Sequence, residues 1–196
     1  MGTTIYLSLG WRGFAILVLF VAGGSALTRL GYAAKRRAGI AEIRQGRRGA
    51  RNALANCGVA VACAVLATIT PFAAAFTAAF AAALGAAFAD TAESEVGQLS
   101  RRAPRLITTL KTVSSGTDGA ISAPGTLAGI AAAGGTALLA LSLGLVTVTI
   151  ALAVWAAAFL GTVADSFVGA LAPRVGNELT NVICTLVAAF FVLLLV

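Results

Sequence analysis

The chain has 196 residues, of which 59% are hydrophobic and 11% are charged, and its mean hydropathy is +0.95. Such a composition suits lipid rather than water as the solvent, so it excludes an ordinary soluble domain and predicts a membrane protein. The formal net charge of +7 does not indicate a nucleic-acid partner, because basic loops that lie against anionic lipid account for it.

A membrane-spanning helix needs about 20 apolar residues, with about 17 as a lower limit. The uncharged stretches divide into six segments of this kind, near Gly13–Thr28, Ala53–Thr70, Phe72–Ala89, Gly125–Leu143, Thr147–Ala164 and Leu179–Val196. Pro71 separates the second from the third, since proline removes a helix donor and favours a turn. We therefore expect an all-α integral membrane protein, with one polytopic domain over residues 1–196 and about six transmembrane helices.

The charged residues gather in three short segments, Arg29–Arg51, Asp90–Asp118 and Asp165–Glu178. These segments hold all seven acidic residues and 13 of the 14 basic residues, and Arg12 is the exception. Short cytoplasmic loops carry an excess of Lys and Arg. We therefore expect loops at about 29–52, 90–124 and 165–178 to be cytoplasmic, with both termini outside, in an inner or plasma membrane of prokaryotic type.

The first charged loop, from Lys35 to Arg51, contains a single acidic residue, Glu42. We favour its interpretation as a topology determinant that lies on lipid headgroups. The alternative is that some of its arginines bind the phosphates of an anionic lipid or a nucleotide, because a guanidinium group can bind phosphate through two hydrogen bonds.

A short pattern occurs at the ends of two predicted spans: Ala89-Asp90-Thr91 and Ala164-Asp165-Ser166, each shortly after a Leu-Gly pair. An Asp near a helix C-terminus opposes the helix dipole, and acidic residues at the edge of the hydrocarbon tend to mark function. One interpretation is a pair of facing carboxylates that hold Mg²⁺, a cation that prefers oxygen ligands, with Glu93 and Glu95 adding oxygens beside Asp90. The other is that both helices continue into water and the Asp side chains are solvated.

Residues 104–126 form a polar loop that is rich in Gly, Ser and Thr and carries one lysine, Lys111. Such a loop lets backbone N–H groups approach phosphates closely, and Gly125-Thr126 would open the next helix at its positive end. The same composition is also typical of ordinary linkers. No G-x-x-x-x-G-K-[S/T] sequence is present, so a nucleotide site here would not be a Walker site.

From about Phe20 to its C-terminus, the chain resembles the integral membrane family known as domain of unknown function 92, which contains plant and cyanobacterial phytyl-phosphate kinases. The motifs that carry the resemblance are Leu54–Gly58, Ala89–Gly97, Pro104 with Ile107–Thr109, Lys111 with Gly116–Ser122, Gly125–Thr126, Asp165–Ser166 with Gly169–Ala170, and Asn181 with Thr185. Relatives commonly carry further hydrophobic helices before the first span found here, so we expect a shortened form or a start placed late.

The resemblance implies catalytic roles for Asp90, Glu95, Lys111 and Asp165, with Mg²⁺ held by the three acidic residues. Glu93 is a weaker candidate, because relatives usually have a small residue at its position. The resemblance also implies a set of nucleotide- or phosphate-binding residues: Asn56, Arg105, Gly116, Thr117, Gly119, Ser122 and Asn181.

The activity implied by the resemblance is phosphoryl transfer from a nucleoside triphosphate, CTP by similarity to related kinases, onto an isoprenoid (phytyl or prenyl) monophosphate to give the diphosphate. The acceptor phosphate is already an oxyanion nucleophile, so no strong general base is required and the lack of histidine is no obstacle. The lipid tail would lie among small-residue helices such as the one over Ala73–Ala89.

Two other classes of protein stay open. A small membrane transporter would also be rich in Gly and Ala, although the acidic residues lie at one face rather than at mid-membrane, where transporter sites usually sit. A non-catalytic membrane scaffold could use Gly and Ala only to pack its helices closely.

Overall fold

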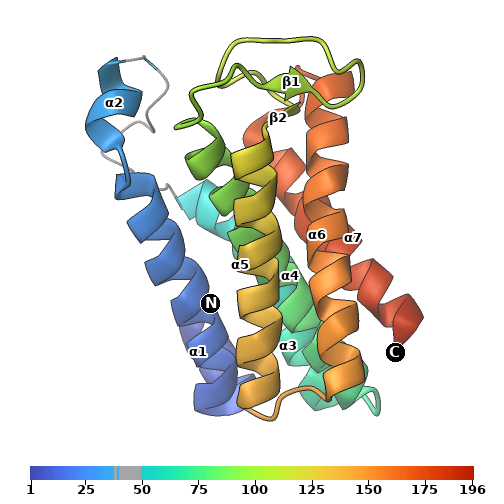
Figure 1. Cartoon of the computed structure of the whole chain (residues 1–196). Coiled ribbons are helices and arrows are strands. Elements are labelled where there is room, and N and C mark those ends of the chain that lie inside the picture. Colours follow the sequence, from blue (N-terminus) through green and yellow to red (C-terminus); the bar gives the residue numbers. More distant parts are fainter. Residues whose placement is uncertain (38, 40–49) are drawn as a thin grey trace.

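The computed structural model describes residues 1–37, 39 and 50–196. Its elements are α1 (Gly2–Arg29), α2 (Tyr32–Arg37), α3 (Ala50–Ile69), α4 (Ala73–Gly97), β1 (Arg105–Leu106), β2 (Ala120–Ile121), α5 (Ala123–Ser142), α6 (Val148–Leu171) and α7 (Asn177–Leu195). Within the described part of the chain, six helices are long and apolar enough to cross a membrane, namely α1 and α3 to α7. The predicted all-α membrane bundle is therefore confirmed (Figure 1). Arg44, Arg47 and Arg48 of the first charged loop lie outside the described residues.

The first helix begins earlier than predicted and reverses direction at Gly10. Gly10 has φ 65° and ψ −164°, a conformation that glycine adopts at little cost. Residues before the reversal pack back on those after it, since the rings of Tyr6 and Phe14 meet edge to face at a centroid distance of 6.1 Å. The predicted first span, which starts at Gly13, therefore corresponds to the part of α1 that follows the reversal.

Helix α4 lies at the centre of the bundle and contacts α1, α3, α5, α6 and α7. Its small side chains permit this, and residues 78–84 have no exposed surface at all, as expected where small residues let helix backbones approach closely. Glycines allow close approaches between the helices, as two examples show. A Cβ atom at Gly85 would lie 3.2 Å from the Ala158 side chain of α6, and one at Gly161 would lie 2.6 Å from the carbonyl oxygen of Cys184 in α7.

Helices α4 and α6 continue well past the residues at which the sequence predicts their ends. The predicted ends are Ala89 and Ala164, whereas the helices end at Gly97 and Leu171. Apolarity alone set the predicted limits, but buried positions such as Thr91 and Glu95 show that neighbouring protein, rather than lipid, surrounds the last turns of α4. Asp90 and Asp165 are thus inside helices and not at their C-termini.

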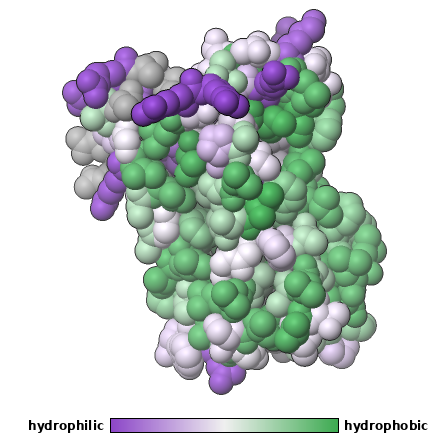
Figure 2. Space-filling view, in the orientation of Figure 1, coloured by the Kyte–Doolittle hydropathy of each residue, from purple (hydrophilic) through white to green (hydrophobic). Residues whose placement is uncertain are grey.

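The polar loop between α4 and α5 is folded into a cap, which we define as residues 98–122. Strands β1 and β2 pair antiparallel, with Arg105 opposite Ile121. Backbone hydrogen bonds from Leu106 N to Lys111 O (2.9 Å) and from Ile107 N to Gly119 O (3.0 Å) close the loop on itself. The cap covers one end of the bundle (Figure 1). Figure 2 shows hydrophilic residues gathered at this end and mainly hydrophobic residues along the helices.

Candidate functional site

A polar cavity of about 240 Å³ lies beneath the cap, where α3, α4, α5, α6 and α7 meet. We call it the cavity. The side chains in its wall that carry a charge, an amide or a hydroxyl group are Asn52, Asp90, Glu93, Ser94, Gln98, Ser115, Thr117, Asp118, Ser122, Thr126, Asp165, Ser166, Asn177, Thr180 and Asn181. Among the residues that the structure describes, every charged side chain in this wall is acidic, so the described wall is suited to a cation or to a ligand that brings one.

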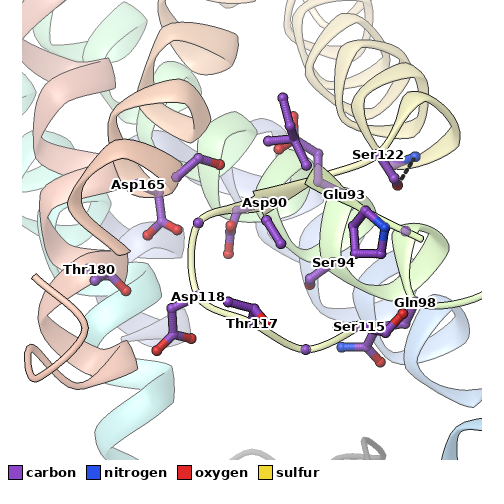
Figure 3. A pocket seen from close by; sticks show the side chains of 18 of the residues that line it. Asp90, Glu93, Ser94, Gln98, Ser115, Thr117, Asp118, Ser122, Asp165 and Thr180 are labelled. Atoms are coloured by element: carbon purple, nitrogen blue, oxygen red, sulfur yellow. Dashed lines mark hydrogen bonds between the residues drawn. The ribbon is translucent and has the colours of Figure 1, made fainter. Parts of the chain in front are cut away.

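Asp90 of α4 and Asp165 of α6 both line the cavity and approach it from two helices (Figure 3). Oδ1 of Asp165 is buried and has no hydrogen-bond partner among the described residues, while Thr180 and Asp118 lie beside the same carboxylate. A buried carboxylate oxygen without a hydrogen-bond partner costs free energy. Such an oxygen ordinarily binds an ion or a water molecule. The unpartnered oxygen therefore marks a position where a ligand would bind.

Glu93 also reaches the cavity, although the sequence makes it the weaker candidate. Its Oε1 accepts a hydrogen bond of 2.9 Å from the Thr162 hydroxyl of α6. On α5, the absence of a side chain at Gly129 leaves room for Glu93, because a Cβ atom there would overlap the Glu93 side chain. The structure therefore holds Glu93 between three helices and presents it to the same space as Asp90 and Asp165.

Glu95 does not line the cavity. Its Oε2 lies 2.5 Å from Nζ of Lys35, and the two side chains are only 6% and 2% exposed, respectively. Helix geometry explains the difference: Asp90, Glu93 and Ser94 share one face of α4, whereas Glu95 lies roughly 140° around the helix from Asp90. The spacing along the sequence could therefore have predicted that Glu93, and not Glu95, shares a helix face with Asp90.

Five of the other predicted residues line the cavity, namely Gly116, Thr117, Gly119, Ser122 and Asn181. Arg105 and Lys111 are exposed on the cap and do not line it. Asn56 is buried and donates to Oδ1 of Asn52 at 2.6 Å, so it supports a residue of the cavity wall without lining it. The residues that the sequence did not single out as site residues include Asn52, Asp118, Asn177 and Thr180.

Two helix N-termini open onto the cavity. At the start of α5, the Ser122 side chain accepts a hydrogen bond of 3.2 Å from Gly125 N, and both residues line the cavity. At the start of α7, Asn177 and Thr180 line it. A helix N-terminus presents unpaired N–H groups and a positive partial charge, and so favours phosphate. The cavity thus combines carboxylates for a cation with helix N-termini for an anion.

Two glycines fix residues 116–122 of the cap to α6. Gly119 has φ +74°, and a Cβ atom on it would lie 2.5 Å from both Ala170 N and Ser166 O. A Cβ atom on Gly169 would lie 2.9 Å from Gly119 N. Only glycine combines this backbone conformation with so close an approach, so the pair sets the position of residues 116–122 over the cavity.

The cavity fits Mg²⁺ through two of the three acidic residues that the resemblance implies. In the described residues, no group of three or more His, Cys, Asp or Glu side chains is arranged to hold a metal ion. Mg²⁺ usually binds through one or two carboxylates together with substrate phosphates, which suits Asp90 and the unpartnered oxygen of Asp165. The placement of Glu95 in an ion pair does not fit a metal ligand.

The fold and the cavity define a polytopic membrane protein with a polar site at one end of its helical bundle. The chain belongs to the family described as integral membrane protein DUF92, whose family model matches residues 1–189. The family expected from the sequence motifs is therefore confirmed. No solved structure matches the chain.

Several curated proteins are similar to the chain. The uncharacterized membrane protein sll0875 of Synechocystis is 36% identical over 96% of this chain and 76% of its own length. The uncharacterized membrane protein MJ0933 of Methanocaldococcus jannaschii is 36% identical over 95% of this chain and 77% of its own length. Protein VTE6, chloroplastic, of Arabidopsis thaliana is 31% identical over 87% of this chain. The chain spans about half, 52%, of that plant protein.

Proposed function

We propose that the protein is a membrane kinase that transfers the terminal phosphoryl group of a nucleoside triphosphate to an isoprenoid monophosphate. The donor that we propose is CTP. The observation that carries this proposal is the cavity, where carboxylates of α4 and α6 meet the N-termini of α5 and α7. The resemblance of the motifs to those of phytyl-phosphate kinases supports the isoprenoid acceptor. The products are the nucleoside diphosphate and the isoprenoid diphosphate.

In the proposed reaction, a phosphate oxygen of the acceptor attacks the terminal phosphorus and forms a new P–O bond, while the bond from that phosphorus to the bridging oxygen breaks. The acceptor is an oxyanion, so the chain supplies position and charge rather than a strong base. Bound Mg²⁺, held by Asp90 and Asp165, would neutralise charge on the phosphates. The first turns of α5 and α7 and the arc over residues 116–122 would bind phosphate oxygens through backbone N–H groups.

Lys111 takes a different role in this proposal from the one that the resemblance implies. It is exposed in the turn between β1 and β2 and does not line the cavity. A lysine at that position attracts the anionic nucleotide toward the cap, since surface charge raises the local concentration of a charged ligand. It does not touch the transferring phosphoryl group.

A transporter is less well supported. The cavity lies beneath the cap at the charged end of the bundle, whereas transporter sites usually lie near the bilayer midplane. The centre of α4 is closely packed, with residues 78–84 fully buried. The packing therefore favours chemistry at one face over passage through the bundle.

The reaction is tested by incubating the purified protein in nanodiscs with Mg²⁺, labelled CTP or ATP, and phytyl, geranylgeranyl and longer prenyl monophosphates. We expect labelled diphosphate from at least one acceptor and loss of the product when a chelator removes Mg²⁺, because the acidic wall of the cavity needs a cation to accept phosphates. Failure to label any acceptor with either nucleotide, by protein that melts cooperatively, would contradict the proposed function.

We also propose that the cap faces the cytoplasm, as the distribution of basic residues favours. The turn between α5 and α6 lies at the opposite end of the bundle (Figure 1). Single cysteines at Ser100 in the cap and Ser142 at the end of α5 test this in intact cells, with an impermeant maleimide and the three buried native cysteines replaced. We expect labelling of Ser142→Cys in intact cells and of Ser100→Cys after permeabilisation. The reverse pattern would invert the topology.

A further inference from the structure

A shallow apolar groove lies outside the cavity, between the cap and the beginning of α5. The residues that line it are Arg105, Leu110, Ile121, Ser122, Ala123, Thr126 and Leu127. Its lining is almost entirely apolar, and it is open along one side rather than enclosed. We call it the groove.

The two leucines of the groove have exposed side chains. Leu110 is 59% exposed and Leu127 is 66% exposed. Leu110 has φ 55°, and it is the one non-glycine residue with positive φ in the part of the chain that the structure describes. A bulky residue in this conformation is a backbone outlier, and such outliers gather at functional sites. Leu110 does not belong to the hydrophobic core.

The groove lies next to the cavity. Ile121, Ser122 and Thr126 line both, so the apolar surface and the polar wall meet at β2 and the first turn of α5. At that boundary, the N-terminus of α5 favours an anion. A molecule that matches the groove, the N-terminus of α5 and the cavity has an apolar chain at one end and a phosphate at the other.

The centre of α4 is too closely packed to hold an apolar chain. The sequence leads us to expect the lipid tail among the small residues of α4, but residues 78–84 have no exposed surface. Those side chains are fully covered by neighbouring helices, so a tail could enter there only if the helices separated. The groove, in contrast, lies open at the outside of α5.

We propose that the groove binds the apolar chain of the acceptor lipid, which reaches the site laterally from the bilayer and passes its phosphate over the first turn of α5 into the cavity. This inference rests on the proposed function and adds to it the place of the chain and the route of the substrate. It commits the groove to a phosphate-bearing lipid rather than to the bulk lipid of the membrane.

The inference is tested with Leu127→Trp, which fills the groove, and with Leu138→Trp as the matched control. Leu138 lies on the same helix and is 65% exposed, but it does not line the groove. We measure KM and kcat for geranylgeranyl monophosphate and for the short dimethylallyl monophosphate. For Leu127→Trp, the ratio of the long-chain KM to the short-chain KM is expected to rise on the order of tenfold, the effect of losing a few methylene contacts. An unchanged ratio, or an equal change in the control, would overturn the inference.

A binding measurement separates this inference from the proposed reaction. A photoreactive prenyl monophosphate in nanodiscs is expected to label peptides around Leu110 and Leu127, and unlabelled geranylgeranyl monophosphate should compete for that labelling whether or not phosphoryl transfer occurs. Equal competition by phosphatidylglycerol would show an ordinary lipid contact and would overturn the inference. Labelling that geranylgeranyl monophosphate competes for, without any phosphoryl transfer, would support lipid binding in the groove and contradict only the proposed kinase reaction.

Discussion

Replacing Asp165 with Asn is expected to lower the rate of phosphoryl transfer by at least about a hundredfold, because loss of a direct ligand should exceed the 10- to 100-fold cost typical of groups that only orient ligands. The helices should stay folded. Oδ1 of Asp165 has no hydrogen-bond partner in the described structure, so the substitution removes charge from the cavity without breaking a hydrogen bond to that atom. The measurement is single-turnover transfer over a range of Mg²⁺ concentrations, with thermal melting alongside.

The matched control is Glu178→Gln, which removes a carboxylate from the same end of the bundle. Glu178 is exposed in the first turn of α7 and does not line the cavity. We expect its rate and its Mg²⁺ dependence to equal those of the parent. A fully active Asp165→Asn protein would remove the cation from the proposal, whereas an inactive protein with a lowered melting temperature would instead assign Asp165 to folding.

The sequence was sufficient for the fold because the solvent imposes a simple rule on it. Uncharged segments of helix length must span the membrane, and this rule found the six helices of the described residues that could span it. The ends of these helices were predicted less accurately. A charged residue marks the end of a lipid-facing segment, but the helix itself can continue where protein surrounds it. Asp90 and Asp165 lie inside longer helices because the cap and α7, rather than lipid, surround them.

The site was only partly predictable, because motif position and helix face are different kinds of information. The resemblance places the second acidic residue of the α4 motif at Glu95, whereas the helix turns Glu93 toward the cavity and Glu95 toward Lys35. The partner of Glu95 could not be found from spacing, since Lys35 lies in a separate charged segment and meets α4 only through tertiary packing. Asn181 of α7 was predicted, but Thr180 of the same helix was missed because nothing local distinguishes a threonine near a ligand from one that packs.

The separate role of Glu95 leads to the second large expected effect, on stability. Replacing Lys35 with Met is expected to lower the free energy of unfolding by about 3–5 kcal/mol, the cost typical of a buried charge that loses its partner. Both side chains of the pair are almost fully buried, and Nζ of Lys35 lies 2.5 Å from Oε2 of Glu95. The measurement is equilibrium unfolding by denaturing detergent in mixed micelles, compared with Arg36→Met, which removes an exposed charge from the same short helix.

The double variant Lys35→Met with Glu95→Met distinguishes an ion pair that maintains the fold from a metal ligand. Two apolar side chains often replace a buried ion pair at little cost, so the double variant should recover most of the stability that Lys35→Met loses. If Glu95 only anchors α2 to α4, transfer and its Mg²⁺ dependence should recover as well, since Asp90 and Glu93 lie on the other face of α4. A stable but inactive double variant would contradict this assignment and return Glu95 to the metal site.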